Sequence, residues 1–308
     1  MITKVKTADR AEWLSLRARY IGGSDAASVI GLNPYKSPYT LWAEKTGRIA
    51  PFEGSVTTRV GTYLEQLVAS MYTEETGNKV RNEHRTFLND AYPWACANID
   101  RMIVRQRAGL EIKTTNDRAK IKQLREGEIP HDWQCQMTHY LAVTDLERWD
   151  LAALCGSREL VILSLERDEE DIHALMTAEQ AFWECVRGEQ PPGVDGTQST
   201  SDTLNAMHFT SDEGSQISLE PVSQYLTALL QLKAEKKALE GRIRMAENAV
   251  KEYMGEAEYG TCGNTSVSWK TVSRVTYDTK ALCREYPDIM GQYEKCSVSR
   301  RFTVKEEK

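Results

Sequence analysis

Residues 109–115 read GLEIKTT, and their alternation indicates a β-strand with two different faces. Side chains two positions apart in a strand point to the same side of the sheet. Glu111 and Lys113 therefore point together, while Leu110 and Ile112 point to the opposite, apolar side. Charged side chains in an otherwise apolar strand need a reason, so we take Glu111 and Lys113 as candidate functional residues.

The preceding segment, residues 94–104, is also predicted to be a strand, and it contains Asp100. The polar residues 105–108 between the two strands favour a hairpin turn. Folding the chain at that turn brings Asp100 close to Glu111 and Lys113. We therefore predict that two carboxylates and one amine converge on one spot.

These groups suit the hydrolysis of a phosphodiester. Carboxylate oxygens hold Mg²⁺ or Mn²⁺, both hard cations, and the backbone carbonyl of Ile112 can add a ligand. Such a metal lowers the pKa of a bound water and neutralises charge on the phosphate, while a neighbouring lysine orients that water. The alternative is an ordinary Glu–Lys pair on a surface strand, because the pattern D-x(n)-E-x-K is short and common.

The first 190 residues mix helical and strand-like segments, which predicts an α/β domain (1–190) with a mixed central sheet flanked by helices. The strands are expected at 79–88, 94–104, 109–115, 148–155 and 159–166, and the helices at 8–19, 57–76, 131–143 and 169–187. Ser24 and Ser37 are predicted to be helix N-caps, with Pro38 at the first helical position. Gly77 is predicted to end the helix 57–76.

The last third of the chain reads as a separate part. Residues 191–216 are rich in Pro, Gly, Ser, Thr and Asp and are predicted to form a linker. A C-terminal helical and β-stranded appendage is expected over 217–308, with a long helix at about 222–254 and strand-like alternation at 266–275.

The long helix carries a heptad pattern, in which the spacing alternates between four and three residues. The positions are Tyr225, Leu229, Leu232, Lys236, Leu239, Ile243, Ala246, Val250 and Tyr253. Lys236 alone interrupts their apolar character. The pattern fits packing against another helix of the same chain as well as packing against a second chain, and both interpretations stay open here.

Composition sets bounds on the class of protein. The formal net charge is −6, whereas proteins that bind nucleic acids usually present a basic surface; a carboxylate cluster, however, becomes a cationic site once it holds metal. The seven cysteines contain no CxxC pair, which fits reduced thiols in a cytoplasm. No stretch of eighteen apolar residues and no apolar signal core is present, so a cytoplasmic protein without a membrane span is expected.

Several short motifs occur in an order that resembles the YqaJ-like phage recombinase nucleases, relatives of phage lambda exonuclease in the PD-(D/E)XK superfamily. The motifs are WLSLR (13–17), IGGSDAA (21–27), GLNPYKSP (31–38), LWAEKTG (41–47), GTYLE (61–65), YPW (92–94), LEIK (110–113) and QMTHYLAVT (136–144). Each motif is modest by itself, but their joint order is specific. The resemblance implies a restriction-endonuclease-like core.

The resemblance also implies roles for individual residues. Asp100 and Glu111 match the metal ligands of the family, and Lys113 matches its catalytic lysine. Glu65 matches a glutamate on the long helix that helps to organise the metals.

A glutamine and a tyrosine four residues apart, Gln136 and Tyr140, match a Q-x-x-x-Y motif of the same family. Residues at this spacing share one helix face, and the motif positions the substrate or the attacking water. A purely structural hydrogen bond under the sheet is the alternative interpretation.

Another set of residues matches the family's binding site for a DNA 5′-phosphate. Arg17 and Ser24 match the arginine and serine of that site, and a helix cap beside a surface arginine is the alternative. The chain departs from the family in having Asn98 where relatives often have serine, so Asn98 would have to replace it. Arg118 and Lys120 both qualify as the basic residue expected after the catalytic lysine.

By resemblance, the chain is expected to be a Mg²⁺-dependent exonuclease, with Mn²⁺ as a second metal, that acts on double-stranded DNA ends. It would degrade one strand 5′ to 3′ and leave a 3′ overhang for a single-strand annealing recombinase. A homo-oligomeric ring, commonly a trimer, and a phage or prophage origin in a bacterial host are implied as well. The alternatives are an endonuclease or nickase of the same superfamily, and a non-catalytic DNA-binding scaffold that uses the long helix to bind a partner.

Overall fold

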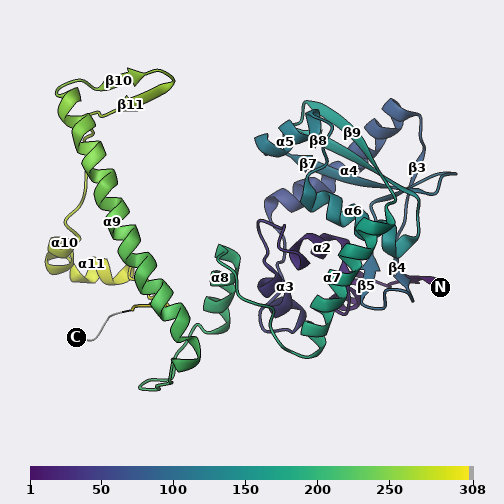
Figure 1. Cartoon of the computed structure of the whole chain (residues 1–308), viewed down its shortest axis with the longest axis horizontal. Coiled ribbons are helices and arrows are strands. Elements are labelled where there is room, and N and C mark those ends of the chain that lie inside the picture. Colours follow the sequence, from purple (N-terminus) through teal and green to yellow (C-terminus); the bar gives the residue numbers. More distant parts are fainter. Residues whose placement is uncertain (305–308) are drawn as a thin grey trace. The chain divides into compact units, whose positions relative to one another are not determined.

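The computed structural model describes residues 1–304, which form two compact units, Met1–His208 and a second that begins at Phe209 (Figure 1). The strands of the first unit are β1 (Ile2–Lys6), β2 (Ile21–Gly22), β3 (Val80–Asn82), β4 (Arg85–Asn89), β5 (Ala95–Ala97), β6 (Arg101–Ile103), β7 (Ala108–Thr115), β8 (Arg148–Cys155) and β9 (Glu159–Glu166). Its helices are α1 (Arg10–Ala18), α2 (Gly23–Val29), α3 (Pro38–Lys45), α4 (Val56–Thr76), α5 (Arg118–Arg125), α6 (His131–Thr144), α7 (Glu169–Arg187) and α8 (Gln198–Met207).

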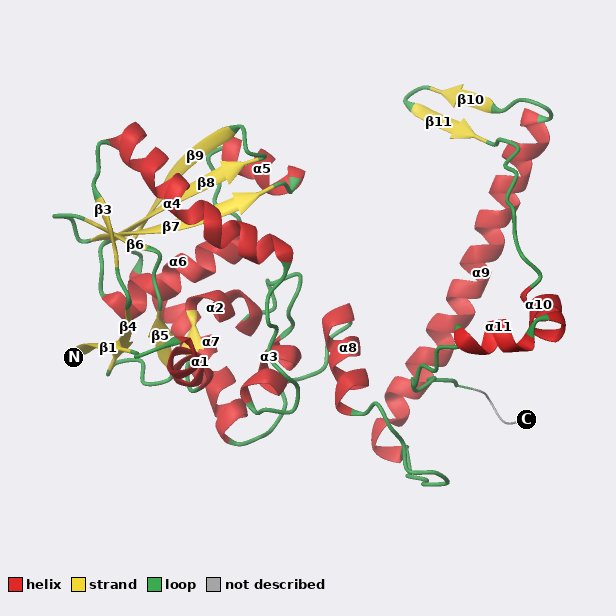
Figure 2. Cartoon of the chain, turned by 180° about the vertical axis from the view of Figure 1, so that it is seen from behind, coloured by secondary structure: helices red, strands yellow, loops and turns green. Residues whose placement is uncertain are grey.

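The larger sheet has five strands in the order β3-β6-β7-β8-β9. Strands β7 and β8 run parallel, and the other neighbours are antiparallel. Helices lie on both sides of it (Figure 2), which confirms the predicted α/β class with a mixed central sheet.

The two faces of this sheet are buried under different helices. On one face, Val68 and Tyr72 of α4 pack with Leu110 and Ile112 of β7. The other face is covered by α6, whose apolar side chains join Trp149 of β8 in a second cluster. The alternation of β7 therefore leaves Glu111 and Lys113 on the α6 side, as the sequence pattern predicts.

A smaller sheet has the order β1-β4-β5-β2. Two of the predicted strands are wrong as single elements, because part of each belongs to this sheet. The segment 79–88 divides into β3 and β4, and the segment 94–104 divides into β5 and β6, so that each contributes to both sheets. The predicted hairpin is therefore the short pair β6–β7, with Arg101 opposite Leu110. The chain changes sheet between β5 and β6, and Asp100 lies in that crossing.

Helix caps define most of the remaining boundaries. Ser37 caps α3 through Thr40 N, and Gly77, in the left-handed conformation, ends α4; both were predicted. The prediction for Ser24 is wrong, because the N-cap of α2 is Gly22 and Ser24 lies inside the helix.

The expected linker 191–216 also differs from the structure, since α8 lies within it and the first unit ends at His208. The hydroxyl of Thr40 on α3 hydrogen-bonds to the side chains of Ser199 and Thr203, both at 2.7 Å. These bonds fasten α8 to the first unit, so the segment without regular structure before the long helix is shorter than the composition suggested.

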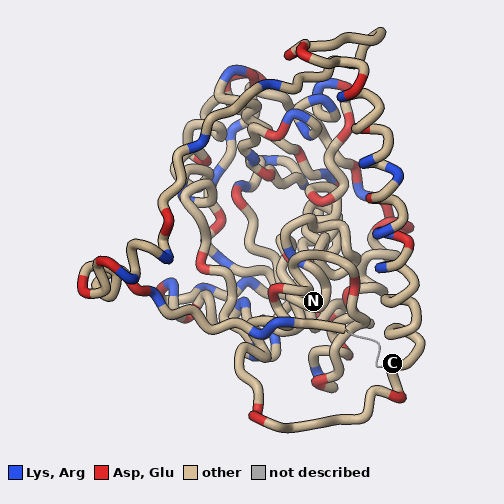
Figure 3. Tube along the Cα trace, turned by 90° about the vertical axis from the view of Figure 1, so that its left-hand side faces the viewer, with Lys and Arg blue, Asp and Glu red and all other residues tan. Residues whose placement is uncertain are grey.

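In the second unit, the short helix η1 (Glu220–Val222) leads into the long helix α9 (Ser223–Met254), close to the predicted bounds. The hairpin β10 (Tyr259–Cys262) and β11 (Thr265–Ser268) and the helices α10 (Thr279–Glu285) and α11 (Pro287–Gln292) follow. Basic and acidic residues are interspersed along α9 (Figure 3). Within the described part of the chain, no helix is long and apolar enough to cross a membrane.

Candidate active site

Glu111 and Lys113 form the centre of the candidate site on β7. The Nζ atom of Lys113 lies 2.6 Å from Oε1 of Glu111. The Glu111 side chain is 2% exposed, whereas that of Lys113 is 24% exposed. The ion pair is therefore closed on the glutamate side and open to solvent at the amine.

The amide of Gln136 on α6 bridges this pair. Its Oε1 accepts a hydrogen bond of 2.8 Å from Lys113 Nζ, and its Nε2 donates one of 2.8 Å to Glu111 Oε1. The same nitrogen donates to the hydroxyl of Tyr140 at 2.9 Å. The structure thus brings Gln136 and Tyr140 to the charged face of β7 and connects them in one network.

Asp100 reaches the site from the crossing between the two sheets. Its Oδ2 accepts a hydrogen bond of 2.8 Å from the backbone N–H of Ile112, the residue between Glu111 and Lys113. The carboxylate is therefore held beside β7 although Asp100 belongs to no strand.

The electrostatics of the site favour a cation. Burial raises the pKa of Glu111 to about 8, with a further contribution from Asp100, although Lys113 opposes both. Burial also raises the pKa of Asp100. For Lys113, burial lowers the pKa, but Glu111 and Asp100 outweigh it and the net shift is upward. Two carboxyl groups that hold their protons this tightly gain most from a nearby positive charge.

One oxygen of the site has no partner. Oε2 of Glu111 is buried and makes no hydrogen bond. A buried carboxylate oxygen without a donor costs free energy unless something else satisfies it. In a metal site, this oxygen, the Asp100 carboxylate and the Ile112 carbonyl would supply oxygen ligands, the kind that Mg²⁺ prefers together with water molecules.

Glu65 on α4 is close enough to Glu111 for its charge to contribute to the raised pKa of Glu111. The Oε2 atom of Glu65 is 3.8 Å from Nη1 of Arg101, and burial and then Asp100 raise the pKa of Glu65. Among residues 1–304, no three acidic, histidine or cysteine side chains are grouped closely enough to hold a metal. A role for Glu65 as a metal ligand therefore stays a prediction from the resemblance.

Three of the four residues expected to bind a 5′-phosphate, Arg17, Ser24 and Asn98, lie around α1. The guanidinium of Arg17 donates a hydrogen bond to Ser24 Oγ and lies 5.3 Å from the ring centre of Trp13. Trp13 Nε1 in turn donates to Asn98 Oδ1 at 2.8 Å, as does Thr86 Oγ1. The Asn98 amide nitrogen has no hydrogen-bond partner among the described residues, so Arg17 and Asn98 offer N–H donors near one another.

Arg118 and Lys120, the two candidate basic residues of α5, differ in their contacts. Lys120 pairs with Asp132 and lies 4.8 Å from the ring centre of Trp133. The exposed Arg118 makes no side-chain hydrogen bond or ion pair to any residue within 1–304. Arg118 is therefore the one whose charge is available to a ligand.

Comparisons with known proteins identify the family of this chain. A family model, the YqaJ-like viral recombinase domain, matches residues 12–147. The protein YqaJ of Bacillus subtilis (strain 168) is 35% identical over 315 residues, which cover 99% of this chain and 97% of YqaJ. The chain belongs to the YqaJ-like viral recombinase family. The family match encloses every candidate site residue, from Arg17 to Tyr140.

Two solved structures have a similar fold. The alkaline exonuclease LHK-Exo from Laribacter hongkongensis has a TM-score of 0.51 and 21% identity, covering 58% of this chain and 94% of that chain. The complex of LHK-Exo with dAMP has a TM-score of 0.52 and 22% identity, with the same coverage. This likeness concerns the fold, and it agrees with the predicted resemblance to lambda exonuclease relatives.

Three charged or polar contacts that were not predicted from the sequence support the domain. Asp25 accepts from Gly22 N at 3.1 Å and pairs with Lys45 at 2.9 Å. Burial alone would raise the pKa of Asp25, but Lys45 and then Arg17 lower it well below its usual range. The Asp25 carboxylate therefore already accepts from a backbone N–H at the start of α2. Its position in the IGGSDAA motif was the sequence signal that could have identified it. Arg101 donates to the Asp100 carbonyl at 2.7 Å, and the sequence pattern did not single it out.

The third overlooked contact is a fully buried pair behind Tyr140. His139 Nδ1 lies 2.7 Å from Glu179 Oε1, and its Nε2 lies 2.9 Å from the carbonyl of Cys96. The pair ties α6 to α7 and to β5. Nothing in the sequence connects His139 with a glutamate forty positions away.

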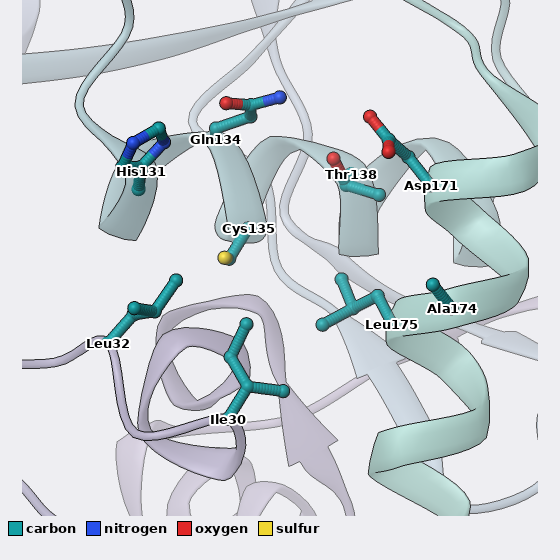
Figure 4. Close-up of a pocket in the computed structure, with 9 residues that line it drawn as sticks. All are labelled: Ile30, Leu32, His131, Gln134, Cys135, Thr138, Asp171, Ala174 and Leu175. Carbon is teal, nitrogen blue, oxygen red and sulfur yellow. The ribbon is translucent and has the colours of Figure 1, made fainter.

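A cavity of about 270 Å³ lies on the other side of α6 (Figure 4). It is lined by Ile30, Leu32, His131, Gln134, Cys135, Thr138, Asp171, Ala174 and Leu175. Successive helix residues turn by about 100°, so the lining residues of α6 face away from Gln136 and Tyr140. This cavity contains none of the candidate site residues.

Proposed function

We propose that this protein is a metal-dependent exonuclease that acts on double-stranded DNA ends. Membership of the YqaJ-like viral recombinase family and the fold shared with an alkaline exonuclease support a nuclease. The direction 5′ to 3′ and the production of 3′ overhangs for single-strand annealing are part of the proposal by resemblance.

The observation that carries the proposal is the unpartnered Glu111 oxygen beside an oriented lysine. Oε2 of Glu111 is buried without a donor, while Oε1 is held by Lys113 and Gln136. A surface Glu–Lys pair would leave no such oxygen, because water would solvate both atoms. The arrangement fits a divalent cation held by Glu111, Asp100 and the carbonyl of Ile112, with Mg²⁺ first and Mn²⁺ as a substitute.

Each residue then has a task in the hydrolysis. When bound, the metal supplies an acidified water and positive charge against the phosphate. Lys113, partly exposed and charged, orients the attacking water and stabilises charge on the phosphate oxygens. Gln136 holds the lysine and Glu111 in fixed orientation through both ends of its amide. Tyr140, whose pKa lies well above its ordinary value because of burial and then Glu111, stays protonated and can donate its hydroxyl hydrogen to substrate.

The donors around α1 would select the end of the DNA. Arg17 and Ser24 are assigned to the terminal 5′-phosphate, with the amide nitrogen of Asn98 and the guanidinium of Arg118 as further donors. Charged N–H donors are the strong ligands of phosphate. A requirement for a terminal phosphate would explain both end dependence and direction.

The decisive measurement is digestion of end-labelled linear duplex in Mg²⁺, in Mn²⁺ and in EDTA. The proposal expects nucleotide release from 5′ ends with either metal and none in EDTA. Sealed circular duplex should stay intact; cleavage of the circle would instead favour an endonuclease or nickase. Binding of duplex without metal-dependent cleavage would leave only a non-catalytic scaffold.

The assembly and partner are proposed by resemblance. A homo-oligomeric ring, commonly of three copies, would keep the enzyme on one DNA, and an annealing recombinase would take up the exposed strand. Mass measurement in solution tests the first point, and binding between the two purified proteins tests the second.

A further inference from the structure

The helix α9 carries an apolar stripe that the second unit does not cover. We call the nine heptad positions from Tyr225 to Tyr253 the α9 seam. No residue of α9 is buried, and six large apolar members of the seam are 45–94% exposed: Tyr225, Leu232, Leu239, Ile243, Val250 and Tyr253. At about 1.5 Å per residue the helix is about 48 Å long, enough for four heptads of coiled-coil packing.

We propose that the α9 seam pairs with the α9 seam of a second copy of this chain in antiparallel orientation; because such a pair is twofold, it would join copies from two different rings if the chain forms a ring of three. In an antiparallel coiled coil, a residue that flanks the seam meets a residue of the same heptad position on the partner helix. With Lys236 of one copy beside Leu239 of the other, Lys233 meets Glu240 and Glu235 meets Arg242. Both contacts occur twice by symmetry, and all join opposite charges.

The same charges oppose a parallel pair. In that arrangement, Lys236 would face Lys236 of the second copy, because seam positions meet their equivalents. Glu235 would face Glu240 twice, and only the contact of Arg242 with Glu247 would be attractive. Like charges directly opposite one another destabilise such an interface.

The register is selected in the same way. Sliding one antiparallel helix by a heptad in one direction places Arg242 against Arg242 and Glu240 against Glu240, and only the attraction of Lys233 with Glu247 remains, so two repulsions and two attractions replace four attractions. Sliding it in the other direction places Glu235 against Glu235 and Lys233 against Lys233. The self-complementary pattern therefore favours a second copy of this chain, in one orientation and one register, as the occupant of the seam.

Cysteine cross-linking of the full chain tests the pairing directly. In the proposed register Leu232 faces Ile243 of the second copy, whereas two Leu232 positions lie about 16 Å apart, eleven residues along the axis. The exposed Cys262, Cys283 and Cys296 are first replaced by serine. A mixture of L232C and I243C chains should then give a disulfide-linked pair, and L232C alone should not.

A charge reversal separates the two orientations again. When both chains carry E235R, the introduced arginine meets Arg242 in the antiparallel pair and should reduce the cross-linked yield about tenfold, since two attractions become two repulsions. The yield should be restored when the L232C chain carries E235R and the I243C chain carries R242E but keeps Glu235, because both contacts then join opposite charges again. The matched control is E252R, which changes a glutamate of α9 away from the seam.

Other results would overturn the proposal. Cross-linking of L232C with itself would show a parallel pair. In that case E235R should raise the yield of this L232C–L232C cross-link, because the introduced arginine would face Glu240. No cross-link in either combination would show that the seam is covered by this chain's own first unit or by another protein. The readout does not involve DNA cleavage, so it is independent of the proposed nuclease activity.

Discussion

The side-chain amide of Gln136 donates a hydrogen bond of 2.8 Å to Oε1 of Glu111, from a helix that covers the sheet to a strand within it. The other end of the same amide accepts from Lys113 at 2.8 Å. One side chain therefore sets the orientation of both charged groups, which an ordinary Glu–Lys pair on an exposed strand would not require.

Replacing Lys113 or Asp100 by alanine is expected to abolish digestion of linear duplex. Loss of an oriented donor at a phosphate costs about 10²–10³ in rate, and loss of a metal ligand costs at least as much. The rate is measured with labelled duplex in Mg²⁺, and folding by thermal melting. Lys122→Ala, an exposed lysine paired only with Glu126 on the same helical segment, is the control and should keep full activity. Full activity of either site variant would remove these residues from the mechanism.

Changing Glu111 to glutamine should make the stability of the metal-free protein less sensitive to pH. The pKa of Glu111 is raised by burial, and then by Asp100, from 4.5 to about 8. A carboxyl with a raised folded-state pKa contributes most to stability below its unfolded value and loses that contribution as pH rises toward 8. In EDTA, the melting temperature of wild type should therefore fall more than that of Glu111→Gln between about pH 5 and about pH 8.5. Glu128→Gln, at an exposed glutamate of the same domain, should follow wild type; parallel curves for all three proteins would refute the prediction.

Gln136→Leu should lower kcat more than it raises KM. The leucine keeps the apolar contacts of α6 but leaves Lys113 and Glu111 without their common bridge, and misplaced groups typically cost about 10²-fold. Tyr140→Phe keeps the ring and loses only the hydroxyl that accepts from Gln136, so a smaller effect is expected. A change confined to the melting temperature in Gln136→Leu would make the bridge purely structural.

Arg17→Ala should remove the difference in rate between duplexes with 5′-phosphate and 5′-hydroxyl ends. Wild type should prefer the phosphorylated end, because Arg17 and Ser24 present donors there. Arg19→Ala is the matched control on the same helical segment, since within residues 1–304 the one hydrogen bond of the Arg19 side chain is to the carbonyl of Ser15. Equal preference in wild type and Arg17→Ala would exclude the proposed phosphate site.

Gly23→Ala should destabilise the fold and reduce activity together. A Cβ atom at Gly23 would lie 2.4 Å from Cε1 of Tyr140, so the start of α2 and the ring must separate. Overpacking of this kind costs about 1–3 kcal/mol, measured by denaturant unfolding. At Gly22 the nearest atom would be Arg17 Nε at 3.6 Å, an ordinary contact, so Gly22→Ala should be milder. Equal unfolding curves for Gly23→Ala and wild type would show that this contact does not constrain the site.

Much of the architecture could be predicted because local patterns report local forces. Strands β8 and β9, the helix α7 and the end of α4 at Gly77 agree with the periodicity and the capping residues. The alternation of β7 also places Glu111 and Lys113 on one face without any knowledge of the fold. The strand predicted at 94–104 was wrong as one element, since periodicity records that a segment is extended but not which sheet it joins.

The sequence by itself determined which charged groups share one face of β7, because the alternation of residues 109–115 places Glu111 and Lys113 together, opposite Leu110 and Ile112. The tertiary structure alone decided what holds these groups and which others join them. Asp100 reaches β7 through the backbone N–H of Ile112, and Gln136 arrives from α6 to join Glu111 with Lys113. Contacts of this kind form when elements far apart along the chain pack together. The free energy of burying apolar surface selects that packing, and local residue spacing does not encode it.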